Sequence, residues 1–423
     1  MPDSSLRILV VLPMYGGSLP IGRYCATALR GMGHSVRIFE APFLYPGFTG
    51  LQNLNLPSSD TAQLEKSFLQ VVSQAVWAQV QSIEPQLVLA MAQAPLNRAL
   101  LQRLRHAGIR TAMWFVEDYH IFTYWQLYAP LYDVFAIIQK EPFISKLKAA
   151  GQSRSLYLPL AALPGFHKPL ALTEKEKREY GADIAFLGAG YPNRRLAFRR
   201  LAGRDFKIWG SDWEGESLLL KHIQRNGARI HEDESVKIYN ATRINLNLHS
   251  SLQTDELVSH GDFVNPRTFE LAAMGAFQLV DTRSLLGELI ADDELATFAS
   301  VEELYGRIEY FLSRPEERAA YAQKAQARVL REHTYVHRMT ALLEYMEESL
   351  GPWPKIHEDK NAQPEFMPEF QEELEQLRHT LGLGPHASFD DVIARLREQR
   401  GCLNDAETAL LFLDEWRKQY LGK

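Results

Sequence analysis

The stretch "GDFVNPRTFELAAMG" at residues 261–275 combines the start of a helix with charged side chains. Asn265 is a good N-cap residue, and Pro266 fits the first turn of a helix, where its missing N–H costs no hydrogen bond. Arg267 and Glu270 are three residues apart, so the expected helix carries them on one face. A helix start with a nearby cation suits a phosphate, and the carboxylate one turn later suits two vicinal hydroxyls.

An Arg and a Glu at this spacing also occur as ordinary ion pairs on solvated helix faces. The surroundings favour a binding site, because a buried strand, "INLNLH" (244–249), precedes the stretch and Asn-Pro opens the helix. Small residues after Glu270 allow close packing on a sheet. His249, at the carboxyl end of that strand, is a further candidate for contact with a ligand.

Apolar runs alternate with helical stretches along both halves of the chain, which predicts parallel sheets built from βαβ units. We expect an α/β fold of two Rossmann-like doubly wound domains, with ligands in a cleft between the carboxyl ends of the two sheets. Pro-rich breaks at 163–181 and 351–364 divide the chain. The expected domains are 1–165, 166–350 and a helical extension at 351–423.

The extension shows only helical periodicity, for example in "FDDVIARLREQR". Its apolar faces need a partner, which is either the main body or a second copy of the chain. A homodimer through these helices is therefore one expectation.

Composition excludes several classes. The 423 residues are 46% hydrophobic and 23% charged, as in globular proteins, and the net charge of −6 disfavours a general nucleic-acid binder. Cys25 and Cys402 fit neither a disulfide framework nor a zinc site, and we expect no metal ligands. The N-terminus lacks a basic region before its apolar run, and no segment reaches membrane-spanning length. A cytoplasmic location is expected.

A second phosphate-binding candidate is "FLGAGYPNRR" (186–195), which follows a strand and opens a helix. Gly188 permits a tight turn with close backbone approach, and Arg194 or Arg195 can neutralise a diphosphate. Trp209 and Gly210 end the next strand in "KIWGSDW", where Trp209 either contacts a base or fills the core.

In the N-terminal half, "MWFVEDYHIFTYW" (113–125) places Glu117, Asp118 and His120 just after a strand. His120 is the best candidate there for hydrogen bonding to a substrate, although a lone His after a strand is more often structural. The neighbouring aromatic residues either stack on a sugar or pack in the core.

Asp262 and Glu270, with seven residues between them, run into "FELAAMGAFQLVDT". This pattern resembles the donor-binding motif of retaining GT-B glycosyltransferases of the group 1 type. "GDFVNPRTFELAAMGAFQLVD", "DIAFLGAGYPNRR" and "KIYNATRINLNLH" together resemble the spore-maturation CgeB-like branch more closely. The resemblance covers roughly 180–345, extends to the N-terminal half only as a fold, and does not include the tail after 355.

The resemblance implies roles for individual residues. Glu270 matches the acid that holds the nucleotide ribose, and Asp262 stands where the larger family has a Glu that contacts the donor sugar. An Arg in the phosphate loop touches the diphosphate in similar proteins, and Arg194 is preferred for this over Arg195. Related enzymes seat the base where Trp209 and Gly210 lie.

The implied function is transfer of a sugar from a nucleotide diphosphate sugar, expected to be a UDP-sugar, to a protein, glycan or small-molecule acceptor. The family implies retention of configuration without a divalent metal or other cofactor. Arg194, Arg267 and the helix dipole would stabilise the leaving diphosphate, and His120 and Asp262 are the other catalytic candidates. A non-catalytic nucleotide-sugar-binding or scaffolding protein and a sugar-nucleotide epimerase are the alternatives.

Overall fold

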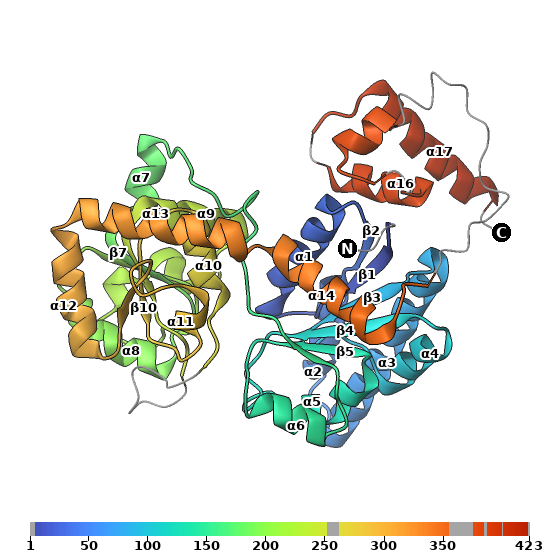
Figure 1. Cartoon of the computed structure of the whole chain (residues 1–423), viewed down its shortest axis with the longest axis horizontal. Helices are drawn as coiled ribbons and strands as arrows, with labels where there is room; N and C mark the ends of the chain where they lie inside the picture. The colour runs from blue at the N-terminus through green and yellow to red at the C-terminus, as the bar shows by residue number, and fades with distance from the viewer. Residues whose placement is uncertain (1–4, 252–261, 355–374, 385–386, 400, 422–423) are drawn as a thin grey trace. The chain divides into compact units, whose positions relative to one another are not determined.

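The computed structural model describes residues 5–251, 262–354, 375–384, 387–399 and 401–421. Packing divides the chain into two compact units (Figure 1). Unit 1 comprises Met1–Ile137, Phe143–Leu156 and Met339–Lys423, and unit 2 comprises Ile138–Pro142 and Tyr157–Arg338. Each unit contains a sheet of parallel strands with helices, so the expected α/β class is confirmed.

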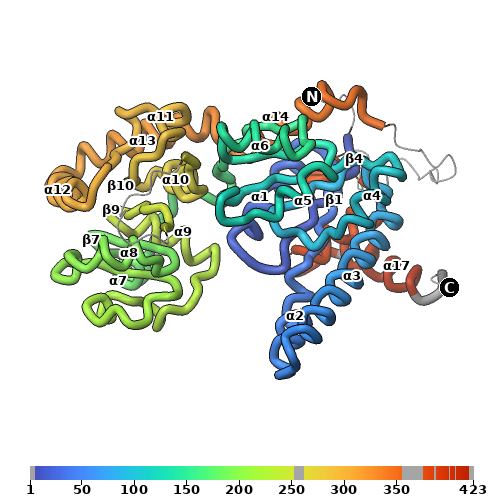
Figure 2. The backbone as a smooth tube through the Cα atoms, turned by 90° about the horizontal axis from the view of Figure 1, so that it is seen from below, coloured from blue at the N-terminus to red at the C-terminus, as the bar shows by residue number. Residues whose placement is uncertain are grey.

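Unit 1 has a six-stranded sheet in the order β2-β1-β3-β4-β5-β6. Its strands are β1 (Arg7–Val11), β2 (Ser35–Phe39), β3 (Leu87–Met91), β4 (Arg110–Phe115), β5 (Val134–Ile137) and β6 (Ser155–Tyr157). Its helices are α1 (Ser18–Gly31), α2 (Tyr45–Gln52), α3 (Ser58–Ile83), α4 (Arg98–His106), α5 (Trp125–Tyr128) and α6 (Phe143–Ala149), with the 3-10 turns η1 (Ala41–Leu44) and η2 (Ala129–Leu131). Helices α2 and α3 lie side by side (Figure 2).

The central strands of unit 1 read as continuous apolar runs because helices cover both faces of the sheet. Every residue of β3 is buried, and β1 is buried except for Arg7. The strand order reverses between β1 and β3, which pair in parallel from Ile8 with Leu87. The carboxyl ends of these strands are therefore the expected ligand edge of unit 1.

Unit 2 has a five-stranded sheet in the order β11-β10-β9-β7-β8. Its strands are β7 (Ala182–Leu187), β8 (Phe206–Trp209), β9 (Thr242–Asn247), β10 (Gln278–Asp281) and β11 (Ala296–Phe298). Its helices are α7 (Glu174–Tyr180), α8 (Pro192–Phe198), α9 (Glu232–Ala241), α10 (Pro266–Ala273), α11 (Leu286–Leu289), α12 (Val301–Leu312) and α13 (Pro315–Glu332), with the turns η3 (Arg199–Leu201), η4 (Leu220–His222) and η5 (Gln224–Gly227). Helix α13 packs on α10.

Helix α14 (Tyr335–Leu350) returns the chain to unit 1, and its residues from Met339 onward pack there. The Tyr345 hydroxyl donates to the Ser155 carbonyl at 3.3 Å. After the helix, Arg110 at the start of β4 donates to the carbonyls of Leu350 and Gly351. The two compact units therefore end at other residues than the expected domain limits of 165 and 350. Pro-rich stretches mark a change in composition, whereas these units are defined by the contacts between residues.

The described part of the C-terminal extension is helical, as expected, with α16 (Phe389–Glu398) and α17 (Asp405–Leu421). It has a small apolar cluster of its own that includes Leu381, Val392 and Leu410. Asp391 at the start of α16 accepts a hydrogen bond from Ser35 Oγ at 2.6 Å and pairs with Arg37 on the edge strand β2. Part of the extension's surface is thus covered by unit 1 itself.

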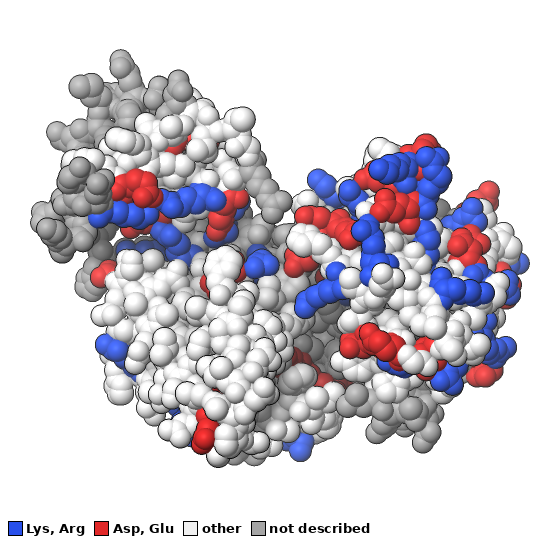
Figure 3. All heavy atoms as spheres, turned by 180° about the vertical axis from the view of Figure 1, so that it is seen from behind, with Lys and Arg blue, Asp and Glu red and all other residues white. Residues whose placement is uncertain are grey.

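The surface of unit 2 carries cations and anions close together, without one large basic patch on the face that Figure 3 shows. The ion pairs of unit 2 include Arg243 with Asp183 at 2.6 Å and Arg225 with Glu234 at 2.7 Å. Across the described residues, no helix has the length and apolar character needed to span a membrane.

Candidate functional site

The strand order of unit 2 reverses between β7 and β9, which pair in parallel through Ile184 with Ile244. In open α/β sheets, ligands bind at the carboxyl ends of the strands beside such a reversal. The phosphate-loop candidate follows β7 and His249 follows β9, so the sheet brings these two sequence predictions to one edge.

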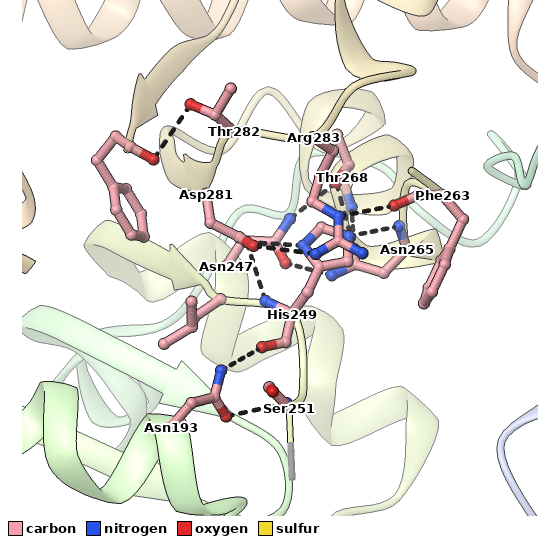
Figure 4. A network of polar contacts seen from close by, with 12 residues as sticks. Asn193, Asn247, His249, Ser251, Phe263, Asn265, Thr268, Asp281, Thr282 and Arg283 are labelled. Atoms are coloured by element: carbon pink, nitrogen blue, oxygen red, sulfur yellow. Dashed lines mark hydrogen bonds and ion pairs between the residues drawn. The ribbon is translucent and has the colours of Figure 1, made fainter. Parts of the chain in front are cut away.

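Buried polar side chains fix the start of α10 at this edge (Figure 4). The Asn265 Oδ1 accepts a hydrogen bond from the Thr268 N–H at 3.1 Å, which confirms the expected N-cap. The Asn265 amide donates to Asn247 Oδ1 at 2.7 Å, and Asn247 donates in turn to Thr268 Oγ1 at 2.9 Å. Strand β9 therefore sets the position of the helix start.

His249 is buried, and both of its ring nitrogens are engaged. Its Nε2 accepts the Asn265 backbone N–H at 2.9 Å, so the ring proton lies on Nδ1 and is donated to Asp281 Oδ1 at 2.7 Å. Burial lowers the pKa of His249, and Asp281 only partly opposes this shift. His249 thus holds Asn265 as a neutral imidazole, with no ring nitrogen left for a ligand.

Several further residues of this network were not predicted from the sequence. Asn193 donates to the His249 carbonyl at 2.8 Å and accepts the Ser251 N–H at 3.1 Å. Arg283 donates to the Phe263 carbonyl at 3.1 Å and lies 3.7 Å from the second oxygen of Asp281. A local signal was present, because Asn247 and Asp281 are polar residues at the carboxyl ends of their strands.

Two guanidinium groups lie against the ring of Phe186 at the end of β7. The Cζ of Arg194 is 5.0 Å from the ring centroid, and that of Arg267 is 5.4 Å from it. Arg194 donates to the carbonyls of Leu248 and Ala189, and Arg267 donates to the Tyr239 hydroxyl at 2.9 Å. In the described part of the chain, neither group forms an ion pair with a carboxylate.

Burial and the nearby Arg267 lower the pKa of Arg194 to about 9. The two neighbouring cations repel each other, so a doubly charged anion between them would be favoured. Arg195 differs from Arg194, because its guanidinium donates to the carbonyls of Gly190, Glu214 and Asp212. The donors of Arg195 therefore hold the loop together.

Glu270 lies one turn after Arg267, and its side chain is 17% exposed. Burial raises the pKa of Glu270 to about 7, although Arg267 partly opposes the shift. His167, which was not predicted, has its Nε2 3.8 Å from the Glu270 carboxylate. Because the Nδ1 of His167 accepts the Leu163 N–H at 3.0 Å, the ring proton is on the nitrogen that faces Glu270.

The loops after β7 and β8 approach each other closely. The Gly188 N–H donates to the Trp209 carbonyl at 2.8 Å. Gly210 has a φ of +112°, and a Cβ there would lie 2.8 Å from the Gly188 carbonyl oxygen. The Trp209 side chain is buried and packs with Tyr180 and Ile238. Of the two interpretations of Trp209, this packing favours core filling.

Asp262 has its side-chain hydrogen bond elsewhere in unit 2, and His120 belongs to the other unit. One oxygen of Asp262 accepts a hydrogen bond from Gln139 at 2.9 Å, and Gly261 beside it lies outside the described residues. His120 belongs to unit 1, where its Nδ1 lies 3.0 Å from Asp118 and two thirds of its side chain is exposed. The aromatic residues around it mostly pack, for example Tyr119 on Phe143 with ring centroids 4.5 Å apart.

The arrangement in unit 2 combines a strand reversal, a helix start held by side-chain hydrogen bonds, one buried and one partly buried cation, and a carboxyl group one turn further along α10. Cations and backbone N–H groups bind phosphate oxygens, and a carboxylate accepts hydrogen bonds from hydroxyls. The edge of unit 2 is therefore suited to a ligand with both kinds of group.

Comparisons with known proteins agree with this description. Residues 177–344, which include the whole network, match a family model described as glycosyl transferase-like. Spore protein CgeB of Bacillus subtilis is 22% identical over 259 residues, which cover 59% of this chain and 77% of that protein.

Two solved structures show the same fold. Sucrose-phosphate synthase of Thermosynechococcus elongatus is 11% identical with a TM-score of 0.54, and the match covers 82% of this chain and 99% of that chain. Anabaena HepE, solved in complex with UDP and glucose, is 12% identical with a TM-score of 0.54, and the match covers 81% and 100% of the two chains. Residues 177–344 therefore resemble glycosyl transferase-like proteins, and the chain shares the two-sheet GT-B fold of these solved structures.

Proposed function

We propose that the protein transfers a sugar from a nucleotide diphosphate sugar to a hydroxylated acceptor, with retention of configuration. The observation that carries the proposal is the pair of guanidinium groups of Arg194 and Arg267 against Phe186. These cations would bind the diphosphate, and Glu270 would accept hydrogen bonds from the two ribose hydroxyls.

The chemical step breaks the bond between the anomeric carbon and the diphosphate and forms a bond from that carbon to the acceptor oxygen, while the proton of the acceptor hydroxyl goes to an oxygen of the leaving diphosphate. Negative charge grows on the diphosphate as it leaves. Arg194, Arg267 and the start of α10 would act on this charge, and stabilisation of charge that develops in the transition state speeds a reaction. In this proposal, the cations of the chain fill the role that a divalent metal has in other transferases.

The base of the nucleotide is proposed to be uracil, since the similar HepE structure holds UDP and glucose. Asp262 is proposed to contact the donor sugar and His120 the sugar or the acceptor, while Gly188 and Gly210 would allow close approach of backbone. A contact between Trp209 and the base has the least support, because the side chain of Trp209 is buried.

Calorimetric titration with UDP, GDP, TDP and CDP, and with UDP-glucose, tests the donor site. We expect UDP to bind most tightly, and Arg194→Met and Arg267→Met to lower its affinity by about 10- to 100-fold each, because each removes charge-assisted hydrogen bonds. Arg200→Met is the matched control, since Arg200 is largely exposed and lies next to Glu302. Equal UDP affinity in all three variants would contradict the proposal.

Transfer itself is tested by following the release of UDP from UDP-glucose with and without a chelator. The proposal predicts turnover that EDTA does not reduce and a product with the configuration of the donor. Tight nucleotide binding without release of UDP in the presence of a wide acceptor panel would favour a non-catalytic binding protein instead.

A further inference from the structure

The carboxyl edge of the sheet in unit 1 carries a cluster of polar side chains that the donor site does not use. Glu117 follows β4 and Gln93 follows β3, so parallel strands bring the two residues together. The Gln93 side-chain amide donates to one oxygen of Glu117. Tyr124 approaches the other oxygen, with its hydroxyl 3.5 Å away.

The cluster holds Gln93 in an unusual conformation. Gln93 has a φ of +63°, in the left-handed region that residues other than glycine rarely occupy. The Tyr124 hydroxyl accepts the Gln93 backbone N–H at 2.9 Å and so supports this conformation. Backbone strain of this kind costs on the order of 1–3 kcal/mol and is concentrated at functional sites.

Glu117 has no cationic partner among the described residues, and the groups that contact it are an amide and a phenol. Burial raises the pKa of Glu117 to about 7, and the hydrogen bonds from Gln93 and Tyr124 only partly oppose the shift. A carboxyl group without a cationic partner can accept hydrogen bonds from neutral hydroxyls. The amide of Gln93 and the phenol of Tyr124 can also form hydrogen bonds with such hydroxyls.

An aromatic surface lies on the next loop of the same edge. Tyr15 follows β1, is half exposed, and its ring centroid lies 4.9 Å from that of Tyr45. The Ser18 hydroxyl ties this loop to the Ala92 carbonyl at 3.1 Å, directly before Gln93. Exposed aromatic rings beside hydrogen-bonding groups suit the apolar face and the hydroxyls of a sugar ring.

We propose that Glu117, held by Gln93 and Tyr124, binds a hydroxyl of a sugar-type acceptor at the carboxyl edge of unit 1, with Tyr15 against the acceptor ring. Glu117 orients the acceptor through a hydroxyl that does not react, so it takes no proton in the transfer step. The inference rests on the proposed glycosyl transfer, for which it names the class of acceptor.

The test measures binding of the methyl α- and β-glycosides of glucose, galactose, mannose and N-acetylglucosamine by saturation-transfer NMR, using the whole chain saturated with UDP. We expect at least one glycoside to bind the wild type. Glu117→Ala should weaken that binding about tenfold or more, and Tyr124→Phe should weaken it less, because Phe keeps the ring but loses the hydroxyl. Glu65→Ala on α3 is the control, with an exposed carboxylate that only contacts Gln52.

The UDP titration separates failure of this inference from failure of the donor proposal. UDP affinity should be the same in wild type, Glu117→Ala and Tyr124→Phe, which also shows that the variants are folded. If UDP binds but no glycoside does, or if Glu117→Ala binds the glycoside as the wild type does, the acceptor inference is overturned. If UDP itself fails to bind, the donor proposal is overturned.

Discussion

Arg194 and Arg195 are adjacent in sequence but have different roles in the structure. The donors of Arg195 are taken by backbone carbonyls of its own loop, whereas Arg194 turns inward to Phe186 and the neighbouring Arg267. Glu270 is similarly distinguished from the surface acids by burial. The chemistry of the candidate site therefore depends on which few charged side chains are removed from water.

The raised pKa of Glu270 predicts a pH dependence of stability. Because its pKa is about 7 in the folded protein and ordinarily 4.5, the folded state binds more protons than the unfolded state between these values. The free energy of unfolding contributed by this group therefore falls as pH rises from about 4.5 to 7. Urea unfolding of the nucleotide-free protein should show that the free energy of unfolding decreases over this pH range. In Glu270→Gln, this decrease should be smaller by about 1–3 kcal/mol.

The same group predicts that UDP affinity rises between pH 6 and 8, because the ionised carboxylate accepts hydrogen bonds from hydroxyls better than the protonated form does. Glu270→Gln should lower the affinity and flatten its pH dependence. Glu117 has a similar pKa but lies in unit 1, so Glu117→Gln serves as the control and should leave the pH dependence of UDP binding unchanged.

His249 predicts a second effect of a single residue. His249→Phe removes the ring N–H that Asp281 accepts and leaves the Asn265 N–H without its acceptor, which should cost roughly 3–5 kcal/mol of stability and lower UDP affinity. His231→Asn is the control, because His231 is exposed at the N-cap of α9 and Asn also caps helices well. A His249→Phe variant as stable as the wild type would show that the network does not fix α10.

At the scale of the elements, the proposed donor site depends on two loops that can approach each other closely only where glycine has no side chain. Gly210 is the clearest case, since it has both a left-handed φ and the Gly188 carbonyl close to where a Cβ would lie. Helix α10 is the complementary case, because side chains from β9 hold its first turn in place.

Gly210→Ala should destabilise the protein by about 1–3 kcal/mol, since the substituted residue is strained and the loop after β7 must move. Gly203→Ala is a matched control, because Gly203 has no atom near the position of a Cβ and no left-handed φ. Thermal unfolding of both variants checks the prediction. Equal losses in the two would indicate that the close contact does not matter.

At the scale of the whole chain, the C-terminal extension is tied to unit 1 by Asp391. This carboxylate contacts Ser35 and Arg37 on the edge strand β2, and Glu398 of the same helix lies 3.4 Å from Arg30. An edge strand presents unpaired backbone groups, and natural proteins commonly cover such edges. The extension covers part of this region.

Asp391→Ala should therefore release the extension from β2. Hydrogen exchange in 387–398 and in β2 is expected to rise by at least tenfold, while exchange in the sheet of unit 2 stays as it was. Asp390→Ala is the control, since the side chain of Asp390 pairs with Arg417 of the extension. Unchanged exchange in β2 would mean that Asp391 does not hold the extension in place.

The sequence by itself determined the strands, the main helices and the start of α10, because hydrophobic periodicity and capping residues act over a few neighbouring residues. Only the tertiary structure decided that both nitrogens of His249 are engaged, that Arg194 and not Arg195 turns inward, and that Trp209 lies in the core. It alone also revealed His167, Asn193 and Arg283 in the site and the attachment of the extension to β2. These features depend on contacts between residues that are tens of positions apart in the sequence, and local sequence patterns do not predict such contacts.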